Sequence, residues 1–195
     1  MRYSLAHRKE TFDKIVESAS RLFNERGYNG VGIDSIMRAV GLTPGGFYNH
    51  FKSKDALFAT ALEESKERFK QILMAGVEDA PNDVWMDVVL RRYLSRDHRD
   101  DISSGCPLPP LAADVSRDKN NAREIFEAYF KSLVEIIEEH TDAKNNEDRL
   151  DLALGTISLA VGGILLARSV KSKRLSDRIL LATRRVALAQ KELKK

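Results

Sequence analysis

Residues 27–54 read GYNGVGIDSIMRAVGLTPGGFYNHFKSK and decide the fold of the first part of the chain. Apolar residues at helical spacing predict a short helix over 33–40, closed by Gly41. Thr43 can cap a second short helix, and Pro44 suits its first turn. A helix, a tight glycine turn and a second helix form the arrangement of a DNA-binding helix-turn-helix.

Small and polar side chains gather on the second of these helices. Gly45 and Gly46 would let the backbone approach phosphates or base edges closely, at a cost of about 1 kcal/mol each in helix propensity relative to alanine. Tyr48, Asn49 and His50 can reach base edges or phosphates. This group of residues is typical of a surface that reads DNA.

The flanking residues complete this pattern. Ser53 can cap the next helix, where Lys52 and Lys54 would form a phosphate clamp together with the helix N-terminus. Phe47 and Phe51 lie one helical turn apart and are expected to anchor the recognition helix in the core.

The net charge of +3 is unevenly distributed. Residues 1–54 hold 9 Lys and Arg against 5 Asp and Glu, whereas residues 55–195 hold 23 against 24. A basic segment on a neutral body indicates an anionic partner for that segment, although a solvated helix with a chance surplus would look the same.

Composition excludes several classes of protein. With 195 residues and 43% hydrophobic content the chain can fill a core, so it is not a disordered protein. Its single cysteine, Cys106, excludes a disulfide scaffold and a cysteine zinc site. No metal spacing is visible, and no cofactor is expected. The longest mainly apolar run, 152–167, is shorter than the roughly 20 residues of a membrane span, and no secretory signal is visible, so a cytoplasmic protein is expected.

Helical periodicity runs through the whole chain and predicts an all-α fold of about nine helices. A polar loop is expected over 95–104, and Asn145, Asn146 and Asp148 interrupt the pattern. The expected helices are about 12–23, 33–40, 43–51, 53–76, 84–93, 110–117, 125–137, 150–170 and 176–193.

The helix over 150–170 is apolar nearly all round and carries small residues such as Gly155, Gly162 and Gly163. Such a helix is buried on several sides, which in a small protein usually needs a partner chain. We therefore expect a homodimer, with a central core helix of a monomer as the alternative. A two-fold dimer would read a palindromic site in double-stranded DNA.

The sequence resembles the TetR-type transcriptional regulators over about 60 residues. The resemblance rests on Leu22-Phe23, Gly27-Tyr28, Ile36, Ala39, Gly41-Leu42, Gly46-Phe47-Tyr48-Asn49-His50-Phe51, Lys54 and Leu57-Phe58. It implies a three-helix DNA-binding head over 9–69, with its motif at about 32–51, on a six-helix ligand-binding and dimerising body over 70–195. Such proteins are mostly repressors that a small molecule releases from an operator. The adjacent glycines point to a subset with a Gly-Gly-Phe-Tyr recognition helix.

Matching positions carry over the residue roles. Thr43, Tyr48 and Lys54 would contact phosphate, while Pro44, Gly45, Asn49 and His50 would face the major groove. Arg2, His7 and Arg8 could reach the adjacent DNA. Gly32 departs from the family, because many relatives have a hydroxyl residue there that contacts phosphate.

The ligand site is expected among the middle helices. Candidate lining residues, each of which could equally be simple core, are Trp85, Tyr93, Cys106, Leu111, Phe126 and Tyr129. Cys106 precedes a predicted helix, whose N-terminus favours a reactive thiolate, and Arg96 and Arg99 stand nearby in sequence. A buried cysteine acting as a small apolar group is the alternative.

Two other functions compete with a ligand-responsive repressor. A thiol enzyme using Cys106 lacks a positioned base, so we do not expect an enzyme. A helical interaction module would bind DNA only weakly and lose that binding steeply with salt.

Overall fold

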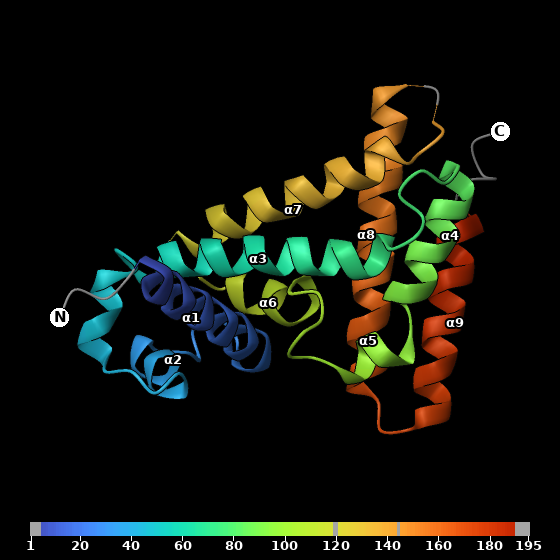
Figure 1. Ribbon diagram of the computed structural model, residues 1–195. Coiled ribbons are helices and arrows are strands. Elements are labelled where there is room, and N and C mark those ends of the chain that lie inside the picture. Colours follow the sequence, from blue (N-terminus) through green and yellow to red (C-terminus); the bar gives the residue numbers. More distant parts are fainter. Residues whose placement is uncertain (1–4, 119–120, 144, 190–195) are drawn as a thin grey trace. The chain divides into compact units, whose positions relative to one another are not determined.

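The computed structural model describes residues 5–118, 121–143 and 145–189. Over these residues it contains helices and no strand, which confirms the all-α prediction (Figure 1). The elements are α1 Leu5–Arg26, α2 Ile33–Ala39, the 3-10 helix η1 Pro44–Asn49, α3 Lys54–Met74, α4 Asn82–Tyr93, α5 Arg96–Asp100, α6 Leu108–Val115, α7 Ala122–Glu139, α8 Asn146–Ser169 and α9 Lys173–Ala189.

The chain divides into two compact units. The first comprises residues 1–68 and 102–129, and the second comprises residues 69–101 and 130–195. The long helices α3 and α7 contribute residues to both.

Aromatic rings form much of the core of the first unit. The ring of Phe23 lies 5.2 Å from that of Phe58 and 5.9 Å from that of Tyr28, centroid to centroid. Phe12 of α1 stacks on Phe51 at 4.8 Å. These contacts join α1 to the turn before α2, to the start of α3 and to the residues after η1.

Helix α6 packs onto α1 and the turn that follows α1. Gly27 closes α1 with a φ of +76°, and a Cβ built there would lie 2.8 Å from Oδ2 of Asp114. That carboxylate accepts the backbone N–H of Asn29 at 3.0 Å. The buried Asn24 amide donates to the carbonyls of Ser103 and Gly105, at 3.2 and 3.1 Å. The segment leading into α6 is therefore a fixed part of the first unit.

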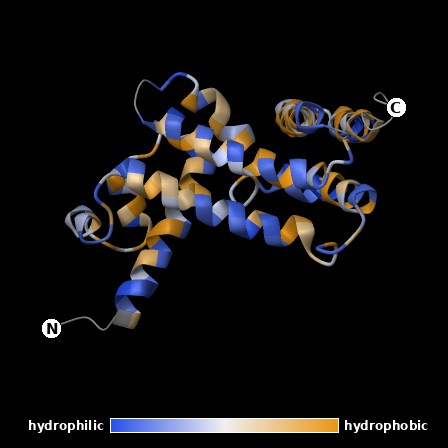
Figure 2. Ribbon diagram, turned by 90° about the horizontal axis from the view of Figure 1, so that it is seen from above, coloured by the Kyte–Doolittle hydropathy of each residue, from blue (hydrophilic) through white to orange (hydrophobic). Residues whose placement is uncertain are grey.

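Helices α8 and α9 lie side by side in the second unit, where Figure 2 views them nearly end-on close to the C-terminal end of the chain. Their close approach depends on Gly163, because a Cβ there would lie 2.7 Å from Cγ2 and 2.9 Å from Cβ of Thr183. This small residue therefore serves packing within one chain.

Helix α8 also passes a length and composition test for a membrane span, with a mean hydropathy of 2.0 over its most apolar 18 residues. Only 39% of that window is buried within the chain. Core helices of folded proteins can have the same length and composition, and α8 packs on α9.

The short helix α5 falls inside the predicted loop 95–104, so that part of the prediction is wrong. Ser95 caps it by accepting the N–H of His98 at 3.1 Å. Arg99 donates to Asp177 of α9 at 2.8 Å, and Arg168 of α8 donates to the carbonyl of His98 at 2.6 Å. Contacts with residues far away in sequence therefore stabilise a helix that local sequence does not reveal.

Other boundaries also differ from the prediction. Asn145 begins a helix where an interruption was expected, because its side chain accepts the N–H of Asp148 at 2.8 Å. Helix α6 begins two residues before Pro110, since prolines fit a first helical turn. The recognition element is a 3-10 helix with Pro44 at its start, and Thr43 makes no side-chain cap. Ser53 caps α3 as predicted. The expected end of the last helix, near 193, lies outside the described residues.

His98 is enclosed by aromatic rings in the second unit. Its ring centroid lies 4.8 Å from that of Phe69 and 4.6 Å from that of Tyr93, and its Nδ1 donates to the carbonyl of Tyr93 at 2.7 Å. Burial lowers the pKa of His98 to about 4, and Arg168 acts in the same direction. The Tyr93 carbonyl and Asp101 act in the opposite direction. The folded protein therefore holds this ring neutral.

The first prediction concerns the contact between α8 and α9. We expect Gly163→Ala to destabilise the protein by about 1–3 kcal/mol, because the new methyl group overlaps Thr183. Gly162→Ala is the control for this contact, since no atom of the same chain lies within 4 Å of its Cβ position, and it should leave the packing of α8 on α9 unchanged. Thermal unfolding at one protein concentration measures both. Equal effects of the two substitutions would contradict this account of the packing.

The second prediction concerns acid sensitivity. Because the pKa of His98 is about 4 in the folded state and about 6.5 when unfolded, the unfolded state binds more protons between these values. Protonation of His98 in the unfolded state should therefore lower the free energy of unfolding by up to about 3 kcal/mol as the pH drops from 7 towards 4. Urea unfolding across this range should show a flatter pH dependence in His98→Gln. An unchanged pH dependence in that variant would count against the assignment.

Candidate DNA-binding surface

The element η1 has one buried face and one exposed face. Phe47 is fully buried and Phe51 is 6% exposed, which confirms that both anchor this element. A Cβ at Gly46 would lie 3.7 Å from Met37 of α2, an ordinary van der Waals distance, so packing within this chain does not require a glycine there. On the other face the Tyr48 side chain is 68% exposed, and Asn49 is exposed beside it. A tyrosine this exposed contributes little to the core.

The residues that begin η1 are also exposed. Thr43, Pro44 and Gly45 are all exposed, and nothing lies within 4 Å of the Cβ position of Gly45. The backbone at Gly45 is therefore open to an approaching group. The hydroxyls of Thr43 and Tyr48 and the Asn49 amide can donate and accept hydrogen bonds there.

Residues outside η1 hold its end in place. The Arg8 guanidinium of α1 donates to the backbone carbonyl of Asn49 at 3.0 Å. Burial lowers the pKa of His50, and the positive charge of Arg8 lowers it further. The ring is therefore neutral at neutral pH. Two other residues were expected near the DNA. Nδ1 of His7 is 4.0 Å from Oε2 of Glu10. Arg2 is outside the residues that the structure describes.

Lys52 and Lys54 have different surroundings. Lys52 is exposed, whereas Lys54 is half-buried and its Nζ donates to the carbonyl of Tyr28 at 2.6 Å. The same ammonium lies 4.0 Å above the Tyr28 ring, and burial lowers its pKa. The Tyr28 hydroxyl donates in turn to Asp55. Lys54 therefore holds the turn between α1 and α2, a role that sequence reasoning missed.

The local candidates follow one another along the chain in and around η1. Thr43, Pro44, Gly45, Tyr48, Asn49 and His50 belong to or flank η1, and Lys52 follows it. Lys54 lies at the first position of α3 with its ammonium turned onto Tyr28. We refer to the exposed residues 43–45, 48, 49 and 52 as the η1 surface.

The candidate ligand-pocket residues are mostly core. Trp85 and Leu111 are fully buried, Cys106 and Tyr129 are 2% and 5% exposed, and Tyr93 is 8% exposed. Phe126 is half-buried. Trp85 and Tyr93 belong to the second unit, and the other four belong to the first.

Cys106 is in contact with Tyr129. Burial raises the pKa of Tyr129 well above its usual value, and interaction with Cys106, including a hydrogen bond, raises it further. Arg96 and Arg99, which sequence proximity suggested as activating charges, bind Asp177 instead. These surroundings are those of a packed thiol.

Comparison with known proteins finds a family match over the segment that contains η1. Residues 15–61 match the family described as bacterial regulatory proteins, tetR family. The chain is 27% identical over 164 residues to the HTH-type transcriptional regulator LmrA of Bacillus subtilis, which covers 82% of this chain and 87% of that protein.

Solved structures of TetR-family regulators share the fold. A regulator from Cytophaga hutchinsonii matches with a TM-score of 0.77 at 22% identity, covering 96% of this chain and 98% of that one. AibR, solved with isovaleryl coenzyme A and operator DNA, matches with a TM-score of 0.61 at 18% identity, covering 87% and 95%. These relatives are regulators and not enzymes. The chain is therefore similar to TetR-family transcriptional regulators in the sequence of its helix-turn-helix segment, over residues 15–61, and in its fold.

Proposed function

We propose that the protein is a dimeric repressor that binds a palindromic operator through the η1 surface and is released by a small-molecule inducer. In this proposal residues 9–69 form the DNA-binding head and residues 70–195 the ligand-binding and dimerising body. Thr43, Tyr48 and Lys52 contact phosphates, while Lys54, whose ammonium binds the Tyr28 carbonyl, supports this surface from the start of α3. Pro44, Gly45, Asn49 and His50 face the major groove.

The observation that carries this proposal is the exposed, polar face of η1. Phe47 and Phe51 fix the element from below, while Tyr48 and Asn49 project away from the core. An α-helix or 3-10 turn that shows hydroxyl and amide groups on a rigid support suits base and phosphate contacts in a major groove. The neutral His50 ring can donate to or accept from a base edge.

Exposed apolar side chains on α8 and α9 support a dimer. Leu165 and Leu166 of α8 are 43% and 58% exposed, and Leu175 and Val186 of α9 are 50% and 54% exposed. A second copy that covered these residues would remove them from water, with about 25 cal/mol gained per Å² of apolar surface. A two-fold pair of heads then fits two half-sites about one DNA turn apart.

The proposed inducer acts on the body. AibR, which has this fold, was solved with an acyl coenzyme A and with operator DNA, and this supports a small-molecule effector here. Modification of Cys106 is the less favoured route to release, because the thiol is 2% exposed. A cytoplasmic location follows from the proposed operator binding.

The third prediction tests specific DNA binding. Purified protein should enrich one palindromic motif from genomic DNA fragments at about 150 mM salt, and bind it with a Kd of about 10⁻⁸ to 10⁻¹¹ M. Asn49→Ala should lose about 1–3 kcal/mol on that motif and less on unrelated DNA, because it removes a base contact. Lys52→Ala should weaken binding to both alike and lower the salt dependence, because it removes a phosphate contact.

Two results would contradict this assignment. Equal losses on specific and unrelated DNA for both variants would remove the distinction between base and phosphate contacts. Enrichment of no motif, together with weak binding lost steeply with salt, would favour the interaction module.

The fourth prediction concerns the thiol. We expect Cys106→Ser to leave the response of DNA binding to hydrogen peroxide unchanged, because the wild-type thiol is buried and packed against Tyr129. The operator Kd before and after peroxide treatment measures this in both proteins. Release of the wild type but not of Cys106→Ser would establish the thiol as the sensor.

A further inference from the structure

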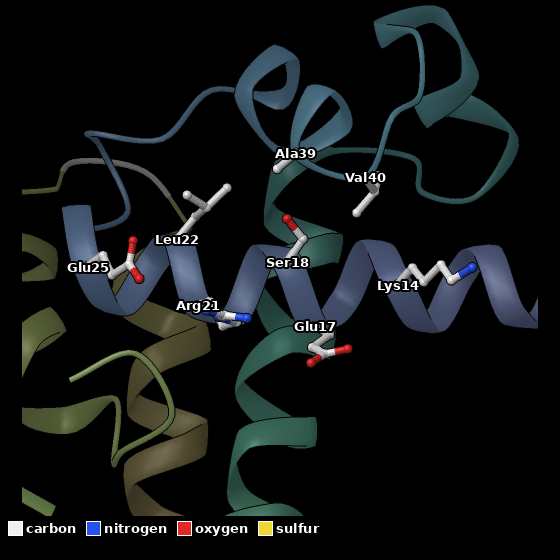
Figure 3. A pocket seen from close by; sticks show the side chains of 8 residues that line it. All are labelled: Lys14, Glu17, Ser18, Arg21, Leu22, Glu25, Ala39 and Val40. Carbon is white, nitrogen blue, oxygen red and sulfur yellow. The ribbon is translucent and has the colours of Figure 1, made fainter. Parts of the chain in front are cut away.

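A groove of about 530 Å³ lies in the first unit between α1 and the end of α2 (Figure 3). Four exposed charged residues of α1 line it, namely Lys14, Glu17, Arg21 and Glu25. We call them the charged row. It extends over about 17 Å of helix and lies outside the η1 surface.

The floor of the groove is apolar. Figure 3 shows Leu22 of α1 pointing towards the end of α2, where Ala39 and Val40 lie. Leu22 and Val40 are half-buried and Ala39 is exposed. Small-molecule pockets are mostly apolar and enclosed, whereas half of the residues here are charged along an extended line. The groove therefore suits a protein surface better than a small ligand.

The charges of the row are available to a partner. Glu17, Arg21 and Glu25 stand four residues apart, a spacing that permits ion pairs along a helix, yet no ion pair involves them within the described part of the chain. Lys14 pairs with Glu10 at 2.7 Å, where both side chains are about 60% exposed. Such an exposed pair is worth a few tenths of a kcal/mol and can exchange readily.

The order of the charges is self-complementary. Along α1 the row reads positive, negative, positive, negative, so the same row read in reverse presents the opposite sign at each place. A two-fold axis between positions 19 and 20 would place Lys14 opposite Glu25 of a second copy, in both directions. Arg21 would then lie beside Glu17 of that copy. Isologous contacts of this kind need a surface that complements itself.

We propose that this groove is a contact between copies of the protein, in which two α1 helices pack antiparallel through the charged row. The contact uses residues of α1 and α2 and none of α8 or α9, and it would join two dimers. A role of this contact in cooperative DNA binding depends on the proposed operator binding, whereas the contact between the two α1 helices does not depend on it. Neighbouring dimers on one DNA would hold their α1 helices at about millimolar effective concentration, which is enough for a weak contact to give cooperative binding.

The test is sedimentation velocity of the full-length protein without DNA. Wild type at about 0.1–1 mM should form a species twice the mass of its basic oligomer, and about 500 mM salt should dissociate it. Lys14→Glu and Glu25→Lys should each weaken this association at least about tenfold, because like charges then face each other. The double variant Lys14→Glu/Glu25→Lys should recover it, and so should an equimolar mixture of the two single variants.

Matched controls lie outside the groove. Lys70→Glu and Glu67→Lys change exposed residues of α3 by the same charges, and they should leave the association unchanged. Thermal unfolding verifies that each variant is folded. The proposal is overturned if wild type forms no larger species, if neither the double variant nor the mixture recovers it, or if the controls lose it equally. Since no DNA is present, a failure of operator binding cannot produce any of these results.

Discussion

The burial of Phe47 is the interaction on which the proposed DNA-reading surface depends. A 3-10 helix of six residues has few hydrogen bonds of its own and would not persist in water. Phe47 and Phe51 insert it into the aromatic core of the first unit, where Phe12 stacks on Phe51. The rigidity of Tyr48 and Asn49 on the outer face is therefore supplied by the ring contacts beneath them.

Local sequence was sufficient for the elements whose stabilising contacts are local. The helix-turn-helix, the buried pair Phe47 and Phe51 and the Ser53 cap were all predicted from spacing and residue type. Helix α5 was missed because Asp177 and Arg168, which stabilise it, lie some 70 to 80 positions further along the chain. The 3-10 geometry of η1 was also missed, since two adjacent glycines leave several backbone geometries open.

The candidate site shows the same division. Residues 43–52 form one continuous segment, so a common surface could be predicted without knowledge of the fold. The hydrogen bond from Lys54 to the Tyr28 carbonyl could not be predicted, because it joins positions 26 residues apart. The pocket candidates come from three helices and the segment before α6, and no local pattern distinguishes pocket-lining residues from core residues. The contact of Gly163 could not be predicted either. Its position among other small residues does not indicate that Thr183 of the same chain packs against it.

The contacts of α6 have a consequence for how such regulators evolve. Asn24 and the backbone of Asn29 find their partners in residues 103–114, far beyond the first three helices. A recombination that exchanged only the first 69 residues would bring in a new residue 24 and a new turn after α1, and both would have to fit the carbonyls of Ser103 and Gly105 and the carboxylate of Asp114. If residues 43–52 bind an operator as proposed, specificity should change by substitution within that segment, or by an exchange that carries the α6 segment along with the head. In this protein the module that can be inherited as a whole is discontinuous in sequence.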